Sequence, residues 1–217
     1  MIISPYLEEE QKAYLVEKWQ EAAGAYSIKP KQQEDIWDLL YAAYADWGRH
    51  YHNLSHLYNL LQLADQWEAQ LEDKALVQMA IFFHDVEYNP KSKDNERLSA
   101  QFARQQLRKP LGAEKCKQLE QYILSTEKHA PLLDEPDCRL FLDFDLAILG
   151  QSWSIYEEYA QAVQKEYVNW YNFLFYKQGR RKAMKSFLDR PQIYYSAVFR
   201  KQYEEQAREN IDREISQ

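Results

Sequence analysis

The sequence contains few of the residues that interrupt helices. Its 217 residues include only five glycines and seven prolines, and both residue types disfavour helix interiors. No apolar run approaches the roughly 20 residues that a membrane-spanning helix needs. The first residues, MIISPYLEEEQ, lack the basic and apolar regions of a secretory signal. We therefore expect a helical, cytoplasmic protein that does not span a membrane.

Cysteine and positive charge are also scarce. The two cysteines, Cys116 and Cys138, do not have the spacing of a zinc site or of a disulfide framework. The net charge of -7 argues against binding to duplex nucleic acid or to an anionic membrane, because such proteins usually carry a basic face. A small phosphorylated molecule remains compatible with this charge, since cations gathered in one pocket can bind an anion.

Apolar residues recur with helical spacing along most of the chain. The segment after Pro30 carries a stripe that Gly48 is expected to end, formed by Ile36, Leu39, Leu40, Ala43, Tyr44 and Trp47. The next helix is expected to start near Asn53 or Ser55, either of which is a suitable N-cap. Further helices are predicted over about 73–84, 95–108, 114–125 and 137–149, with two or three more beyond Gly150.

This pattern predicts an all-α fold. No internal repeat or low-complexity linker divides the sequence, and its 46% hydrophobic content is enough for one substantial core. We expect a single helical domain over residues 1–217 with N- and C-terminal helical extensions. One predicted helix after Gly150 has an aromatic stripe, for which core or dimer contacts are favoured over base stacking, at Tyr156, Tyr159, Val163, Tyr167 and Trp170.

The dipeptide His84-Asp85 ends the predicted helix that carries the apolar run Met79–Phe83. Two adjacent metal-binding side chains at the end of a buried segment indicate a metal site. His56 upstream and Asp145 downstream complete a set of two imidazoles and two carboxylates. Such a set can hold Mn, Fe, Co, Ni, Mg or Zn and leaves coordination positions for water and substrate. A divalent metal ion is therefore the expected cofactor.

The last ligand must be chosen between Asp143 and Asp145. On a helix, Asp145 lies within the apolar stripe, four residues after Phe141 and seven after Cys138. Asp143 is about 200° away around the helix axis. A carboxylate that faces the core is costly unless it is paired or metal-bound. We therefore predict Asp145 as the ligand and Asp143 as an outer-shell or surface group; the alternative is a surface Asp pair without a metal role.

This arrangement resembles the HD superfamily of metal-dependent phosphohydrolases. The strings that carry the resemblance lie between about Arg49 and Arg180: RHYHNLSHL, FFHDVEYNP, KDNERLSA, STEKH and DFDLAILG. They are similar to a subfamily of predicted HD-type phosphohydrolases that has no firmly assigned substrate. The resemblance implies an HD-domain helical bundle that hydrolyses a small phosphorylated substrate, a nucleotide or another phosphate ester, with metal-activated water.

The residues from His52 to His56 also resemble the HNxxH element of cyclic-nucleotide phosphodiesterases. That resemblance implies that His52 is a general acid that protonates the leaving oxygen; the alternative is that it supports a metal ligand or anchors substrate. Leu57 replaces the alanine of that family, and no other segment resembles its nucleotide pocket. We therefore do not predict cyclic-nucleotide hydrolysis. Glu87, two residues after Asp85, is a candidate to orient or deprotonate the attacking water.

Other polar residues are candidates for supporting roles. Arg49, His129 and Arg180 are predicted to line the pocket and contact substrate, because a guanidinium fork or an imidazole suits a phosphate oxygen. A solvated charged face is the alternative for Arg180, and an exposed loop histidine for His129. Asp94 and Glu96 are expected either to support the metal ligands or to stabilise the start of the following helix.

Two other functions remain open at this point. A di-iron oxygenase of the HD type needs more histidines, and with only five in the chain it would have to recruit both His52 and His129. A non-catalytic module that binds a metal or a small molecule is the other alternative, because no glycine- or lysine-rich phosphate loop is evident. A monomer and a homodimer are both compatible with the sequence.

Overall fold

The computed structural model describes residues 1–168 and 170–217. Over these residues the protein is all-helical and contains no strand, which confirms the predicted fold class. The elements in chain order are α1 (Glu9–Ala25), α2 (Pro30–Tyr44), α3 (Leu54–Gln66), η1 (Glu68–Gln70), α4 (Lys74–Phe83), α5 (Asn95–Ser125), α6 (Pro136–Leu146), η2 (Ala147–Gly150), α7 (Trp153–Val168), α8 (Phe173–Leu188) and α9 (Ala197–Ile215).

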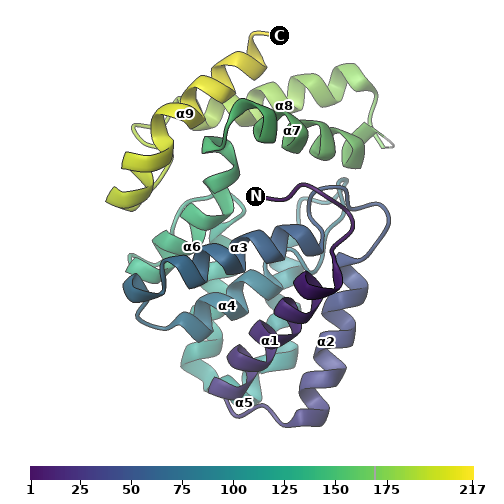
Figure 1. Cartoon of the computed structure of the whole chain (residues 1–217), viewed down its shortest axis with the longest axis vertical. Coiled ribbons are helices and arrows are strands. Elements are labelled where there is room, and N and C mark those ends of the chain that lie inside the picture. Colours follow the sequence, from purple (N-terminus) through teal and green to yellow (C-terminus); the bar gives the residue numbers. More distant parts are fainter. Residues whose placement is uncertain (169) are drawn as a thin grey trace.

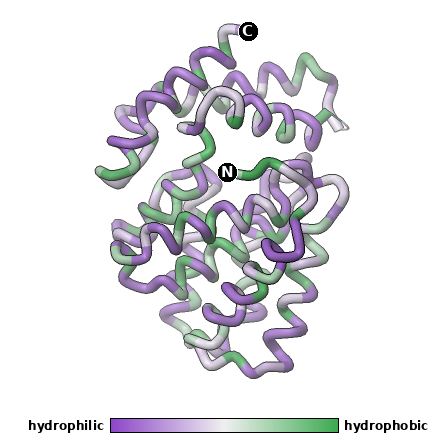
Figure 2. The backbone as a smooth tube through the Cα atoms, in the orientation of Figure 1, coloured by the Kyte–Doolittle hydropathy of each residue, from purple (hydrophilic) through white to green (hydrophobic). Residues whose placement is uncertain are grey.

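The helices lie in two groups (Figure 1). Helices α1 to α5 occupy one end of the molecule and α7 to α9 the other, and the chain passes between them through α6 and η2. In Figure 2, hydrophobic and hydrophilic segments alternate along most helices, as expected for helices that bury one side. The buried hydrophobic side chains form a cluster that extends from Leu7 to Ile211. None of the described helices is long and apolar enough to cross a membrane.

Helix α4 lies at the centre of the first group. It packs against α1, α3, α5 and α6, and every residue from Leu76 to Phe83 is buried. A helix that is apolar on all sides is stable only when neighbours cover it completely. The Asp73 side chain caps its first turn by accepting the backbone N–H of Leu76. The other end delivers His84 from the core to the junction between the two groups.

Helix α3 begins after an Asn cap. The Asn53 side chain accepts the backbone N–H of Ser55 at 2.9 Å, which satisfies one of the free donors of the first turn. Asn53 is therefore the N-cap, one of the two predicted candidates. His52 lies before the helix, so it does not share a helical face with His56, and the local chain turn determines its position instead.

Three predicted helix limits differ from the structure. Helix α2 ends at Tyr44, and the predicted stripe members Leu39 and Trp47 are 48% and 84% exposed. The predicted helices on either side of Gly112 form one element, α5, which breaks at Gly112 with a φ of 75°, a conformation that glycine adopts readily. Helix α6 ends at Leu146, and the 3-10 helix η2 continues to Gly150.

Candidate metal centre

Three elements bring metal-binding side chains together. His56 lies in the first turn of α3, His84 caps the end of α4, and Asp145 lies in the last turn of α6. The two histidine Nε2 atoms are 3.1 Å apart. The Oδ1 atom of Asp145 is 3.3 Å from Nε2 of His56 and 3.9 Å from Nε2 of His84. Both imidazoles are only 1% exposed, so these donors converge in the interior.

Asp85 adds a fourth donor. Its Oδ2 atom lies 3.1 Å from Nε2 of His84 and 3.9 Å from Nε2 of His56. Ligand atoms about 2.1 Å from a common ion lie about 3.0 Å apart at a right angle and about 3.4 Å apart at the tetrahedral angle. The distances between donor atoms in this cluster run from 3.1 to 3.9 Å, that is, from about the right-angle value to somewhat above the tetrahedral value. His56, His84 and Asp145 could together hold one metal ion, and the Asp85 carboxylate lies beside His84.

Neighbouring groups orient two of the ligands. Nδ1 of His84 lies 2.8 Å from the carbonyl oxygen of Ile81. Because a carbonyl only accepts, Nδ1 donates to it, and Nε2 is the ring nitrogen that faces the cluster. Asp145 accepts a hydrogen bond from Nε2 of His129 at 3.0 Å through its other oxygen, Oδ2. His129 thus orients a proposed ligand, although the sequence predicted that it contacts substrate.

The two carboxylates of the cluster are held in their charged form. Burial raises the pKa of Asp145, but hydrogen bonds from His129 and His56 hold it well below its ordinary value. Burial also opposes ionisation of Asp85 and His84. Their mutual attraction is stronger, so it lowers the pKa of the Asp85 carboxyl and raises that of His84 to about 9. Burial lowers the pKa of His56. Both carboxylates are therefore ionised at neutral pH.

His52 is held by Glu166 of α7, a residue that the sequence interpretation missed. Nδ1 of His52 lies 2.7 Å from Oε2 of Glu166. The backbone N–H groups of Tyr51 and His52 donate to Oε1 at 2.7 and 3.0 Å. The Tyr88 hydroxyl donates to Oε2 at 2.8 Å, and its ring stacks on the His52 imidazole with 4.4 Å between centroids. The position and the tautomer of His52 are therefore fixed.

Glu166 and His52 each stabilise the charged form of the other. Burial raises the pKa of Glu166, but His52 lowers it to about 2. Burial lowers the pKa of His52, and the charge and hydrogen bond of Glu166 outweigh that effect and raise it. Glu166 had a recognisable signal, because it lies on the aromatic stripe of α7, three residues after Val163 and seven after Tyr159. A carboxylate that faces the core is costly unless it is paired. This argument, which identified Asp145, applies equally to Glu166.

The cluster opens into a cavity of about 890 Å³ between the two groups of helices. His52, Asp85 and Asp145 line it on one side. Lys93 and Lys128 also line it, and both are exposed and form no ion pair within the described residues. Other lining residues include Tyr51, Tyr88, Glu96, His129, Tyr159, Tyr167, Arg180 and Arg190. Two of the proposed ligands, Asp85 and Asp145, thus face one space with the His52 imidazole and two lysines, and this space is large enough for a small molecule.

Arg49 does not line this cavity. Its guanidinium is buried and donates to the carbonyl oxygens of His52, Asp85 and Val86 at 3.2, 2.7 and 2.8 Å. These bonds join the segment before α3 to the segment after α4. The predicted contact of Arg49 with substrate is therefore replaced by a contact that holds His52 and Asp85 in place.

Arg180 lines the cavity, but its donors are already engaged. Nε and Nη2 bind the two carboxylate oxygens of Glu214 at 2.8 and 3.1 Å. Nη1 donates to the Tyr159 hydroxyl at 3.0 Å. The predicted guanidinium fork for phosphate is thus occupied by a carboxylate of α9. Lys93 and Lys128, which the sequence interpretation did not select, are the cations free to meet an anion.

The acidic candidates near α5 lie in different surroundings. Glu87 is exposed and does not line the cavity, so the structure does not place it beside the cluster. Asp94 is also exposed, precedes α5 and pairs with Arg97 at 3.1 Å. Glu96, in the first turn of α5, lines the cavity, and burial raises its pKa.

Asp143 is fully buried and binds backbone rather than facing the cluster. Its two oxygens accept the N–H groups of Tyr195 and Ser196, both at 2.7 Å. Burial raises the pKa of Asp143 to about 6. Ser196 is the N-cap of α9, so Asp143 anchors the start of that helix. The surface position considered from the sequence is wrong.

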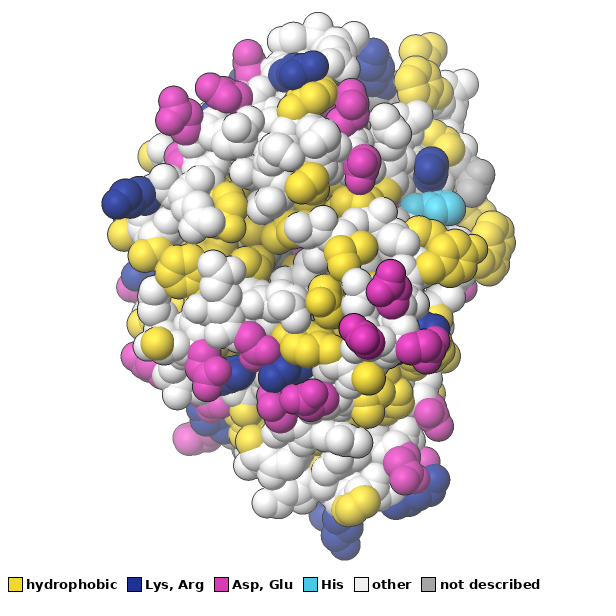
Figure 3. All heavy atoms as spheres, viewed as in Figure 1, with side chains coloured by type: hydrophobic (Ala, Val, Ile, Leu, Met, Phe, Trp, Pro, Cys, Tyr) yellow, Lys and Arg dark blue, Asp and Glu magenta, His cyan; other side chains and the backbone are white. Residues whose placement is uncertain are grey.

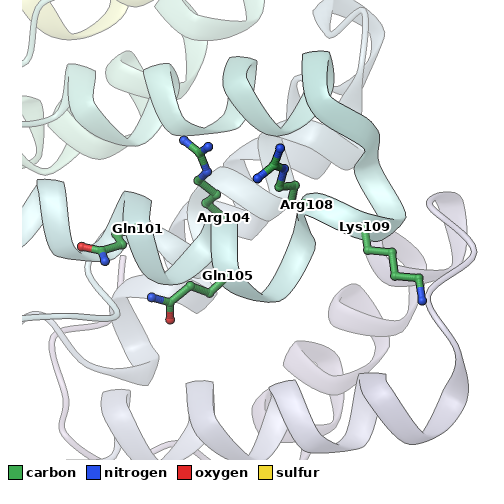
Figure 4. A pocket seen from close by; sticks show the side chains of 5 residues that line it. All are labelled: Gln101, Arg104, Gln105, Arg108 and Lys109. Atoms are coloured by element: carbon green, nitrogen blue, oxygen red, sulfur yellow. The ribbon is translucent and has the colours of Figure 1, made fainter.

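A separate groove of about 700 Å³ lies on α5 (Figure 4). Its lining consists of Gln101, Arg104, Gln105, Arg108 and Lys109. Arg104 and Arg108 point toward the second half of α5, where Arg104 lies 3.5 Å from Glu120. Neither histidine nor carboxylate lines this groove. The cavity beside the cluster is therefore the candidate site for hydrolytic chemistry.

No protein-family model, curated protein or solved structure matches this chain. Function is therefore inferred from the chemistry of the cluster and the cavity.

Proposed function

We propose that the protein is a metal-dependent phosphohydrolase of the HD type that acts on small phosphate esters. The observation that carries this proposal is the convergence of two imidazole nitrogens, 3.1 Å apart, with two carboxylates at the wall of a cavity of about 890 Å³. The ligands follow the order His56, His84-Asp85, Asp145 along the chain. A divalent ion held there supplies an activated water and polarises a phosphoryl oxygen.

His52 is the proposed general acid. Its Nδ1 proton is directed to Glu166, so Nε2 remains available for proton donation on the cavity side of the residue. The raised pKa keeps the imidazole protonated over a wider pH range. A donor of this kind transfers its proton to the oxygen that leaves phosphorus as the ester bond breaks. Glu166 is its positioning residue.

Lys93 and Lys128 are the proposed contacts for the phosphate oxygens. They come from the loops before α5 and α6 and line the cavity that also contains Asp85 and Asp145. Their ammonium groups offset the negative charge of the two carboxylates and attract an anionic substrate. This assignment gives them the role that the sequence suggested for Arg49 and Arg180.

The test is elemental analysis of the purified protein and its His84→Ala variant, followed by phosphate-release assays on a nucleotide and sugar-phosphate panel with Mn, Co, Ni or Mg. We expect stoichiometric metal and metal-dependent phosphate release in the parent protein and neither in the variant. His50→Ala is the matched control, since His50 lies outside the cluster and the cavity. Absence of both metal and turnover in the parent protein contradicts the proposal.

Two other results would redirect the assignment. Stoichiometric metal with tight phosphate-ester binding but no turnover would indicate the non-catalytic binding module. Oxygen consumption by the Fe(II)-loaded protein would indicate the di-iron oxygenase.

A further inference from the structure

A second cavity of about 290 Å³ adjoins the proposed catalytic cavity. It lies along α7, α8 and the turn between them. The two cavities share the lining residues Val163, Tyr167, Arg180 and Ala183, so they meet along a common wall. The smaller cavity is near the lower end of the roughly 300–1,000 Å³ typical of small-molecule pockets. The two cavities therefore lie next to each other.

Four aromatic side chains line this second pocket, those of Tyr167, Tyr171, Phe175 and Tyr176. The Tyr167 ring lies 6.2 Å from that of Tyr171 with 26° between their planes, and 5.8 Å from that of Tyr176. Phe175 also lines the pocket and is 70% exposed. Figure 3 shows hydrophobic side chains gathered over this end of α7 and α8, at the upper right. Exposed apolar surface that surrounds a hollow is typical of a binding site.

The pocket contains little uncompensated charge. Arg180 is the charged residue of its lining, and the carboxylate of Glu214 neutralises that guanidinium through two hydrogen bonds. Lys93 and Lys128 line the larger cavity only. The two spaces therefore differ in chemistry: the larger one suits a phosphate beside a metal ion, and the smaller one suits an uncharged planar group.

We infer that this aromatic pocket binds the planar aromatic group of a phosphate ester whose phosphate lies beside the metal cluster. The inference rests on the proposed function and specifies its substrate class, an ester that carries a nucleobase or another aromatic ring. Stacking against aromatic side chains tolerates different rings because every ring has a π-face. Phe175 and Tyr171, at the exposed rim, are the specificity residues.

A binding experiment without an ester tests the pocket separately from hydrolysis. Saturation-transfer NMR is recorded on the full chain with adenosine, benzyl alcohol and ribose as probes. We expect saturation of the aromatic protons of adenosine, much weaker signals from ribose, and an adenosine affinity that falls roughly tenfold or more in Phe175→Ala. A benzyl alcohol signal as strong as that of adenosine assigns the pocket to aromatic rings in general, and a weaker one assigns it to nucleobases.

Phe173→Ala is the matched control, because Phe173 is also exposed and lies on the same helix but lines a different cavity with Trp153 and Gln217. It should leave adenosine binding unchanged. Equal signals from adenosine and ribose, or equal losses in the two variants, overturn the inference. A smaller sedimentation coefficient in Phe175→Ala would also overturn it, because the rim would then be a contact between copies of the chain.

Kinetics distinguish failure of the pocket from failure of the proposed function. We expect kcat/KM for adenosine 5′-monophosphate to exceed that for ribose 5-phosphate by roughly tenfold or more, and Phe175→Ala to remove that preference. Hydrolysis of both esters at equal rates rejects the aromatic pocket and leaves the phosphohydrolase standing. Adenosine binding without hydrolysis of any ester rejects the phosphohydrolase and leaves the pocket standing.

Discussion

Glu166 influences the proposed chemistry without facing the metal cluster. Its carboxylate is buried, holds two backbone N–H groups and Nδ1 of His52, and raises the pKa of that imidazole. A general acid must be protonated to act, so activity falls as the pH rises through the pKa of His52. The charge of Glu166 therefore extends activity toward higher pH.

Glu166→Gln removes this charge and keeps a side chain of similar size. We expect the basic limb of the kcat/KM profile to move to lower pH, because the pKa of His52 loses its electrostatic support. The measurement is the pH dependence of phosphate release at saturating metal. Glu158→Gln changes an exposed carboxylate of the same helix and should leave the profile unchanged. An unaltered limb in Glu166→Gln would show that this pair does not set the proton-transfer step.

His52→Ala tests the acid directly. We expect kcat to fall roughly 100-fold or more, the usual contribution of a positioned general acid, while metal content stays near that of the parent protein. Substrates whose leaving groups need no protonation should lose much less. A uniform loss across good and poor leaving groups would assign His52 to substrate anchoring instead.

Single residues also show where sequence interpretation succeeds and where it stops. The positions of His56, His84, Asp85 and Asp145 were informative because each lies at the end or on the buried side of a helix with a clear apolar pattern. Arg49 and Arg180 misled for a physical reason: a guanidinium that binds backbone carbonyls or a distant carboxylate has the same local sequence as one that binds phosphate. Partners far apart in the chain, such as Arg180 and Glu214, have no local signal.

Helix interiors were predictable and helix ends less so. Apart from Gln78, every residue of α4 from Leu76 to Phe83 is apolar and buried, and this run made both the helix and the position of His84 predictable. The apolar pattern of α2 continues to Trp47, but the helix ends at Tyr44. Tertiary contacts, which periodicity does not reveal, decide how far neighbouring elements cover the apolar stripe. Gly150 illustrates the same limit of sequence-based prediction. The position needs a small residue because it lies against Tyr203 of α9, which is distant in the chain.

Gly150→Ala tests the packing of η2 against α9. A methyl group at this position would lie 2.6 Å from Cβ of Tyr203 and 2.8 Å from its carbonyl oxygen. Both atoms are near the backbone, so α9 would have to move, and overpacking of this kind costs roughly 1–3 kcal/mol. Urea unfolding should show that loss. Gly24→Ala, where a methyl group meets no atom within 4 Å, is the control and should not destabilise the protein.

Asp143→Asn tests the anchor of α9. An amide offers one acceptor oxygen where the carboxylate serves two buried N–H groups. One donor is left without a partner, and we expect the free energy of unfolding at neutral pH to fall by roughly 1–3 kcal/mol. Asp38→Asn, an exposed carboxylate on α2, provides the comparison in chemical denaturation. Equal stability of both variants would contradict the anchoring role.

The same carboxyl affects stability as a function of pH. Its pKa is raised from 3.8 to about 6 in the folded protein, so the folded state binds more protons than the unfolded state between these values. Stability from this group therefore decreases as pH rises from about 4 to about 6. Comparison of the parent protein with Asp143→Asn at several pH values should show that this decrease is absent from the variant.

At the scale of the whole molecule, the proposed metal site connects elements that are distant in sequence. Its proposed ligands come from α3, α6 and the segment that ends α4, and these three helices form part of the core beneath the cavity. An ion that binds the folded chain and not the unfolded one stabilises the fold by about 2.7 kcal/mol at a free concentration 100 times its Kd. For a chain of this size, that gain corresponds to a rise in Tm of roughly 5–10 °C.

We therefore expect added metal to raise Tm by this amount and a chelator to reverse the rise. His84→Ala should show no metal-dependent shift, because it loses the Nε2 atom that lies 3.1 Å from both Nε2 of His56 and Oδ2 of Asp85. His50→Ala should keep the full shift. The measurement is calorimetry of the three proteins with and without Mn, Co, Ni or Mg. Equal shifts in all three would place the stabilising ion elsewhere, whereas a shift that only His84→Ala lacks would tie metal binding, and the chemistry built on it, to the junction between the two groups of helices.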